Sequence, residues 1–307
     1  MTGISRDEPR ETRAVMKISL CIPYAKTDYD RQTTLDWCRM ADEGPFESLG
    51  CGERIVSHTQ DMSIVLAAAC ALTERVRIVP SLYILPMHSA VRVAKELATM
   101  DVLSDGRVTA TVGVGGREHD YKAVGASFKK RLQRLDDGVA EMKRTWDGVP
   151  PFEGTDPVGP PPVQKGGIPV WSGAMNPKSI ARSSKWADGL YGFTMNGDAG
   201  PAKQQFDLAT AAWEAEGRAR PYLATGFWCC LADDSENRLK QYVVDYLKII
   251  DENVANLIAD TMVTSNEDAV RKCLDDIEAL GADECFLNTA TRDLVEIEKI
   301  ANIVETR

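Results

Sequence analysis

The sequence predicts a single α/β domain built as a (β/α)8 barrel. Strand and helix patterns alternate from residue 16 to the C-terminus, and eight strands are each followed by helix. The pattern is clearest in residues 71–116, where an amphipathic helix joins two strands and leaves no room for a hairpin return. Strands connected in this way are parallel, and their crossover is right-handed.

The first half of the chain supplies four strand–helix pairs. Strands are predicted at residues 17–22, 48–55, 76–82 and 108–114. The helices that follow them are predicted at 32–43, 64–72, 90–103 and 128–146. The last of these is the most regular, because its apolar residues recur at intervals of three and four: Leu132, Leu135, Val139, Met142 and Trp146.

The second half begins with a proline-rich segment at 149–164, which contains six prolines. It is either a linker between domains or a long surface loop, and the loop is favoured because the strand–helix alternation resumes directly after it. Further strands are predicted at 168–172, 189–194, 223–231 and 284–288, with helices at 177–187, 201–216, 235–257, 267–280 and 294–304. We therefore expect one barrel domain at 16–307, preceded by a flexible polar extension at 1–15 that lacks the apolar run of a signal peptide.

Composition and charge narrow the function. The net charge of −10 argues against nucleic acid or an anionic membrane as the main partner. Apolar residues make up 44% of the chain, enough for a sizeable core, yet no run approaches the roughly 18 apolar residues of a membrane helix. The eight cysteines show no CxxC spacing, so buried free thiols in a cytoplasmic protein are expected.

Candidate binding residues lie where strands end, which is the active face of a parallel barrel. Ser172, Gly173 and Ala174 end one strand shortly before a helix, where backbone N–H groups favour a phosphate; a plain turn explains them equally well. Thr194 ends the next strand and would add a hydroxyl donor.

Gly113, Gly115 and Gly116 follow the fourth strand. They do not match the dinucleotide-binding fingerprint, because the third glycine is misplaced and the strand is not the first. They indicate either a tight turn or the close approach of a flat ring to the backbone.

The three histidines follow different strands and lack the spacing of a metal site, so no metal is predicted. Each is more typical of a surface position than of a catalytic one. His58 is the strongest candidate of the three, because it lies just beyond the second strand. No GxSxG elbow or Walker motif is present.

Taken together, these segments resemble the luciferase-like monooxygenase superfamily, the bacterial-luciferase barrel of flavin- and deazaflavin-dependent oxidoreductases. The similarity runs from Met16 to the C-terminus. It is carried by LTERVRIVPSLYIL (72–85), AKELATMDVLSDGRVTATVGVG (94–115), IPVWSGAMNPKSIARSSKWADG (168–189) and EDAVRKCLDDIEALGADECFL (267–287).

The resemblance implies a cofactor site at the mouth of the barrel. Ser81 and Leu82 would form the bulge that backs the isoalloxazine ring, often through a non-proline cis peptide. Gly113 and Gly115 would lie where the fourth strand meets cofactor and substrate. The residues matching the phosphate region are Ser172, Gly173, Ala174 and Thr194.

The sequence departs from the family at the end of the second strand. Deazaflavin-dependent members often carry an acid–histidine pair there, whereas this chain has Glu53 and Arg54, with His58 four residues later. An arginine cannot shuttle protons near neutral pH, but it can hold an anionic substrate or the charge of a reduced ring. Arg54 and His58 are therefore the candidate catalytic residues.

The function implied by the resemblance is a two-component monooxygenase that uses reduced FMN, delivered by a separate reductase, and oxygen on a small organic substrate. One alternative is a coenzyme F420-dependent reductase or dehydrogenase that transfers hydride, with an F420 reductase as possible partner. Another is a non-catalytic flavin-binding barrel. The resemblance also implies a homodimer, for which the helices at 64–72 and 90–103 are the candidate face.

Overall fold

The computed structural model describes residues 15–25 and 28–307. Its strands form one parallel sheet in the order β3-β2-β1-β9-β8-β7-β6-β5-β4. The strands are β1 (Lys17–Cys21), β2 (Ser48–Cys51), β3 (Arg77–Pro80), β4 (Tyr83–Ile84), β5 (Ala110–Gly113), β6 (Val170–Ser172), β7 (Gly189–Tyr191), β8 (Tyr222–Cys229) and β9 (Glu284–Thr289).

The predicted barrel is confirmed, with one refinement at its third strand. The strand predicted at 76–82 is broken, because β3 ends at Pro80 and β4 begins at Tyr83. β3 pairs with β2 and β4 with β5, and a bridge from Ile78 to Val108 joins the remaining edges. The two pieces therefore act as one barrel strand.

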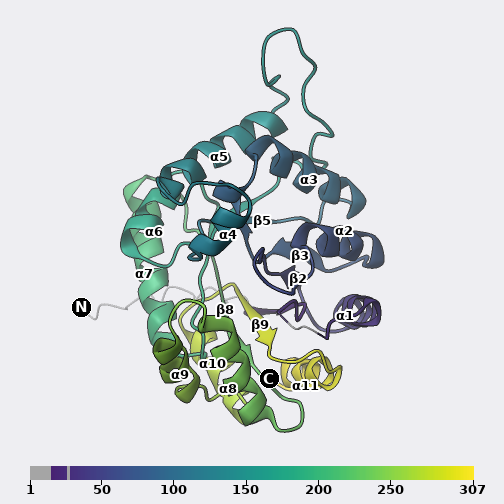
Figure 1. Cartoon of the computed structure of the whole chain (residues 1–307), viewed down its shortest axis with the longest axis vertical. Coiled ribbons are helices and arrows are strands. Elements are labelled where there is room, and N and C mark those ends of the chain that lie inside the picture. The colour runs from purple at the N-terminus through teal and green to yellow at the C-terminus, as the bar shows by residue number, and fades with distance from the viewer. Residues whose placement is uncertain (1–14, 26–27) are drawn as a thin grey trace, which may run out of the picture.

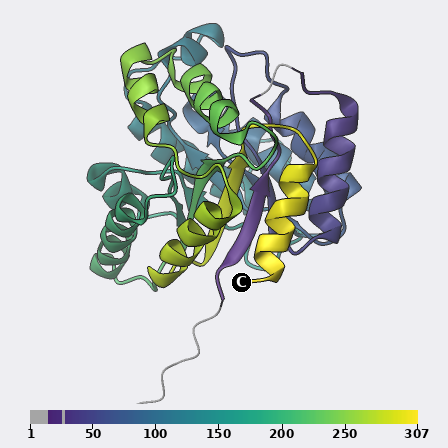
Figure 2. The same cartoon turned by 90° about the horizontal axis from the view of Figure 1, so that it is seen from below.

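Helices surround the strands (Figure 1). They are α1 (Arg31–Glu43), α2 (Met62–Leu72), α3 (Ala90–Leu103), α4 (Glu118–Ala123), α5 (Arg131–Trp146), α6 (Pro177–Ser183), α7 (Ala199–Ala215), α8 (Ser235–Leu247), α9 (Glu252–Asp260), α10 (Glu267–Ala279) and α11 (Val295–Glu305), with a short 3-10 turn at Leu85–Met87. The view from below shows α1 and α11, the first and last helices, side by side outside β1 (Figure 2).

The helix predictions need four corrections, the simplest being that the helix predicted at 177–187 ends at Ser183. The helix predicted at 128–146 begins at Arg131, because Lys130 adopts a left-handed backbone conformation (φ 55°). The helix predicted at 235–257 is two helices, and Asp251 caps the second by accepting a hydrogen bond from the Val254 N–H (2.9 Å). α4 was not predicted, since a helix of six residues is too short to show a periodicity.

The proline-rich segment is a loop, as predicted, and it projects beyond α3 and α5 (Figure 1). Lys95 and Asp101 of α3 hold its base: Lys95 Nζ donates to the Gly159 carbonyl (2.6 Å), and Asp101 Oδ2 accepts from the Val163 N–H (2.8 Å). The predicted extension at 1–15 lies outside the described residues except for exposed Val15.

The main core fills the space between the strands and the surrounding helices. A separate cluster from six strands lies inside the barrel: Cys21, Val79, Trp171, Tyr191, Ala224 and Phe286. All eight cysteines are buried and free, which confirms the prediction of reduced thiols. Within the described residues, no helix is long and apolar enough to cross a bilayer.

Candidate active site at the barrel mouth

A cavity of about 470 Å³ opens at the carboxyl ends of the strands. This volume falls in the range of roughly 300–1,000 Å³ that is usual for cofactor and substrate sites. Eight of the ten predicted site residues line it: Arg54, Ser81, Leu82, Gly113, Gly115, Ser172, Gly173 and Ala174. The structure therefore brings together residues that follow four different barrel strands.

The break between β3 and β4 forms one wall of the cavity. The Ser81–Leu82 peptide is cis, as the resemblance implied. Ser81 is fixed on both sides, because its N–H donates to the Cys51 carbonyl (2.8 Å) and its hydroxyl shares a hydrogen bond with the Tyr191 hydroxyl (2.6 Å). Leu82 follows directly and lines the cavity.

The glycines of β5 and the β6 loop make room for Leu82. A Cβ at Gly113 would lie 2.9 Å from Leu82 Cδ1, and one at Gly173 would overlap Leu82 Cδ2. Gly115 has a positive φ of 58°, and a Cβ there would lie 2.9 Å from Ile84 Cδ1. Leu82 and Ile84 thus pack directly on backbone and leave an apolar surface toward the cavity, which suits a flat ring.

The region of β6 and α6 supplies polar groups. Arg182 of α6 pairs with Asp136 of α5, and Trp186 Nε1 donates to the second carboxylate oxygen of Asp136 (3.1 Å). Arg131 at the start of α5 also lines the cavity, with its guanidinium carbon 3.9 Å from the centre of the Phe128 ring. The Nε atoms of Arg131 and Arg182 are buried without hydrogen-bond partners.

Arg131 and Arg182 are further candidates for binding a phosphate, whereas one of the predicted backbone donors is already used. The Gly173 N–H is already donated to the Val112 carbonyl (2.9 Å), so it is not available to a ligand. Sequence reasoning missed Arg131 and Arg182 because each is a single basic residue in an otherwise ordinary helix. Both reach the same cavity only in the folded chain, where Asp136 of α5 pairs with Arg182 of α6.

Arg54 and Arg117 both contact one tyrosine, Tyr246. Their guanidinium carbons lie 4.0 Å and 5.0 Å from the centre of the Tyr246 ring, and Arg117 Nη2 donates to the Tyr246 carbonyl. Burial and the neighbouring charge of Arg54 lower the pKa of Arg117. Burial also opposes the charge of Arg54, but Tyr246 and Tyr24 outweigh it and raise the pKa of that guanidinium.

The acid that follows β2, Glu53, has a histidine partner that the sequence did not predict. Glu53 Oε1 lies 2.7 Å from His88 Nε2, and Glu53 Oε2 accepts from the Ile84 N–H (2.6 Å). Burial alone would lower the pKa of His88, but the hydrogen bond and charge of Glu53 raise it. The two residues are 35 positions apart, so no local motif could reveal the pair.

Two predicted site residues do not line the cavity. His58 is exposed in the bend after β2, four residues beyond Arg54. Thr194 is buried, and its hydroxyl donates back to the Gly226 carbonyl (3.5 Å) while Phe193 and Met195 face the cavity. Among the described residues, no group of three His, Cys, Asp or Glu side chains could hold a metal ion.

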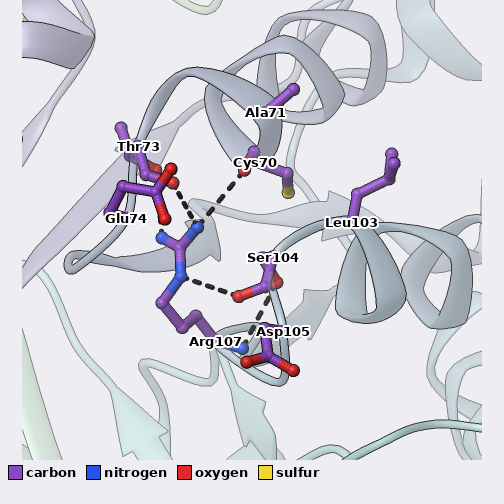
Figure 3. A pocket seen from close by; sticks show the side chains of 8 residues that line it. All are labelled: Cys70, Ala71, Thr73, Glu74, Leu103, Ser104, Asp105 and Arg107. Carbon is purple, nitrogen blue, oxygen red and sulfur yellow. Dashed lines mark hydrogen bonds between the residues drawn. The ribbon is translucent and has the colours of Figure 1, made fainter.

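A second hollow, of about 190 Å³, lies at the opposite end of the strands, near the ends of α2 and α3 (Figure 3). Arg107 points into it, but all five of its side-chain N–H groups have acceptors. Nε donates to the Ser104 carbonyl, and the two terminal nitrogens donate to Thr73 Oγ1 and the carbonyls of Cys70, Thr73 and Val76. This arginine therefore caps two helices, as expected on the stability face of a barrel.

Comparison with known protein families identifies the family of this barrel. The family model of the luciferase-like monooxygenases matches residues 16–291. The chain belongs to this family. Its members are flavin- or F420-dependent oxidoreductases and monooxygenases.

Individual relatives match only part of the chain. Rv0953c of Mycobacterium tuberculosis is 34% identical over 137 residues, which cover 41% of this chain and 48% of that protein. The oxygenase component of the flavin-dependent trigonelline monooxygenase of Acinetobacter baylyi is 25% identical over 165 residues, 49% of this chain and 44% of that protein. The matches thus span about half the length of these relatives.

Solved structures extend the likeness of the fold to nearly the whole chain. An F420-dependent secondary alcohol dehydrogenase, in complex with an F420–acetone adduct, superposes with a TM-score of 0.78. The two chains are 16% identical, and the match covers 95% of this chain and 98% of the other.

Proposed function

We propose that this protein is the oxygenase of a two-component monooxygenase, which receives reduced FMN from a separate reductase and oxidises a small organic substrate with oxygen. The supporting observation is the cavity at the barrel mouth, where an apolar surface formed by Leu82 and Ile84 meets a surplus of arginine side chains. Bound there, reduced flavin would supply the electrons that activate oxygen.

The residues of the cavity fit such a cofactor. Leu82, packed on Gly113 and Gly173, would support the ring, because a larger residue at either glycine would force Leu82 toward the cavity. Arg131, Arg182 and Ser172 would hold the phosphate, since guanidinium groups bind phosphate oxygens in charge-assisted pairs. The buried, unpartnered Nε atoms of both arginines support this assignment.

Arg54, the residue after Glu53, favours oxygenation over hydride transfer. Hydride transfer to a carbonyl needs a nearby proton donor, and Arg54 does not release a proton near neutral pH. His88 contacts Glu53 but does not line the cavity. Oxygenation instead needs a site that binds the reduced cofactor and substrate and excludes water, which the largely buried walls formed by Tyr191 and Trp228 favour.

The second candidate is F420-dependent hydride transfer, and the Glu53–His88 pair favours it. The Glu53 side chain is 8% exposed and lines the cavity, and its hydrogen bond to His88 gives it a proton source behind the wall. In this reaction Glu53 would relay a proton from His88 to the substrate.

Oxidation of the bound cofactor by oxygen distinguishes the two functions. Reduced FMN, mixed anaerobically with the protein and then with oxygen, should reoxidise with a time course different from that of free reduced FMN. Reduced F420 should show no protein-dependent change. The proposal fails if the protein leaves FMN oxidation unchanged and binds reduced F420 instead.

We also propose that the protein acts as a cytoplasmic homodimer. Support for the dimer comes from α2, where Ile64 is 71% exposed and Leu72 is 44% exposed. Sedimentation of the purified protein tests this assembly, since a monomer at micromolar concentration would contradict it.

A further inference from the structure

The group formed by Arg54, Tyr246 and Arg117 lies at the cavity and has no role in the cofactor site described above. Arg54 follows β2, Arg117 follows β5 and Tyr246 belongs to α8, so three distant segments converge on it. Tyr24 adds a fourth, because its hydroxyl lies 3.2 Å from the Tyr246 hydroxyl. The tyrosine ring carries both guanidinium groups through cation–π contacts.

These two cations lack a matching anion. Neither Arg54 nor Arg117 forms an ion pair with a carboxylate among the described residues, and Arg117 Nε is buried without a hydrogen-bond partner. Asp120 attracts Arg117 electrostatically without forming an ion pair, and its own Oδ2 is unpartnered. Two partly buried like charges repel each other, so an anion bound between them would be strongly favoured.

The surroundings of the arginines are aromatic. The centre of the Trp228 ring lies 5.0 Å from the centre of the Tyr246 ring and 5.1 Å from the centre of the Phe193 ring. All three residues line the cavity. Their edge-to-face arrangement leaves flat apolar surface beside the cations. An aromatic ring that carries an anionic group would use both features at once.

The phosphate of the cofactor does not need this pair. Arg131 and Arg182, on α5 and α6, already provide two guanidinium groups with unpartnered Nε atoms. The second pair, Arg54 and Arg117, is therefore available to bind a different negative charge in the same cavity.

We propose that Arg54 and Arg117 bind the carboxylate of a planar aromatic substrate whose ring packs against Phe193 and Trp228. The inference rests on the proposed function and names the substrate class of its site. The carboxylate would replace the missing counter-ion, while Tyr246 fixes the spacing of the two guanidinium groups. Arg54 and Arg117 are then specificity-determining residues for an aryl or heteroaryl carboxylic acid.

The test is calorimetric titration of the protein with benzoate, nicotinate, phenylacetate and cinnamate, and with the corresponding amides. It is carried out on protein without flavin and on protein with reduced FMN under anaerobic conditions. At least one carboxylate should bind about tenfold or more tightly than its amide, and Arg54→Gln or Arg117→Gln should reduce that binding about ten- to hundredfold. Arg39→Gln, at an exposed side chain of α1, is the matched control and should bind as the wild type does.

The outcomes separate this inference from the proposed function. If the Gln variants lose carboxylate binding but bind reduced FMN normally, the inference holds. If they lose reduced FMN instead, the guanidinium groups hold the charge of the cofactor and the inference is wrong. It is also overturned if no carboxylate binds better than its amide. Failure of the wild type to bind flavin while it binds a carboxylate would overturn only the proposed function.

Discussion

The contact between Leu82 and Gly113 gives the sharpest prediction about the cofactor wall. In Gly113→Ala the new Cβ would lie 2.9 Å from Leu82 Cδ1 and 3.1 Å from Cδ2. Carbon atoms pack at about 3.5–4.0 Å, so Leu82 must retreat by roughly 0.5–1 Å. Backbone lies behind it, and the open direction is the cavity.

The cost of this change should appear in binding rather than in folding. The end of a leucine side chain moves easily in a cavity that holds no ligand, so the free energy of unfolding should fall by less than about 1 kcal/mol. A bound ring would have to displace Leu82 again, and overpacking of this kind costs about 1–3 kcal/mol. We therefore expect the affinity for flavin to fall about 5- to 150-fold. Gly173→Ala, where the overlap is larger, should lose at least as much.

Quenching of flavin fluorescence measures the affinity, and thermal unfolding measures the stability. Gly116→Ala is the matched control, because it also lines the cavity but a Cβ there meets nothing within 4 Å. If Gly113→Ala binds flavin as tightly as Gly116→Ala does, Leu82 does not support the ring and the cofactor site is misassigned.

Three further predictions test other parts of the structure. Arg182→Gln should weaken FMN binding about tenfold or more but leave riboflavin binding unchanged, because only FMN carries the phosphate; an equal loss for both flavins in fluorescence titrations would contradict this. The folded state raises the pKa of His88, so the Glu53–His88 pair stabilises the protein fully below about pH 6.5 and loses that effect as the pH rises through the folded pKa. The difference in unfolding free energy between the wild type and His88→Gln, measured in urea, should therefore be larger by about 1 kcal/mol at about pH 5.5 than at about pH 9. A difference that does not change with pH would refute the pairing. Arg107→Ala should lower the free energy of unfolding by about 2–3 kcal/mol without changing flavin affinity, since it removes the caps of α2 and α3 at the far end of the barrel; a matching loss of affinity would show that the two ends are coupled.

The barrel could be predicted from the sequence because its signals are local and repeated. Each buried strand and each amphipathic helix shows its own periodicity, and the alternation of the two determines the topology. The break at Ser81–Leu82 has no such periodicity and came from the resemblance instead. The split between α8 and α9 was missed because the apolar spacing continues past the cap at Asp251.

The site was only partly predictable, because its polar groups meet through tertiary structure. Residues at strand ends, such as Arg54 and Gly113, could be placed at the mouth from topology alone. Arg117 and Tyr246 could not, since they reach the cavity from a loop after β5 and from α8, 129 positions apart. The hydrogen bond between Glu53 and His88 could not be predicted either, because His88 lies 35 positions away, after the short turn that follows β4.

The central claim is that the cavity at the barrel mouth binds a flavin for use with oxygen. Anaerobic fluorescence titration of the purified protein with reduced FMN, oxidised FMN and coenzyme F420 tests it most directly. We predict that reduced FMN binds most tightly, at one molecule per chain, and that Gly113→Ala weakens this binding. Selective binding of F420, or no binding of any of the three, would contradict the claim.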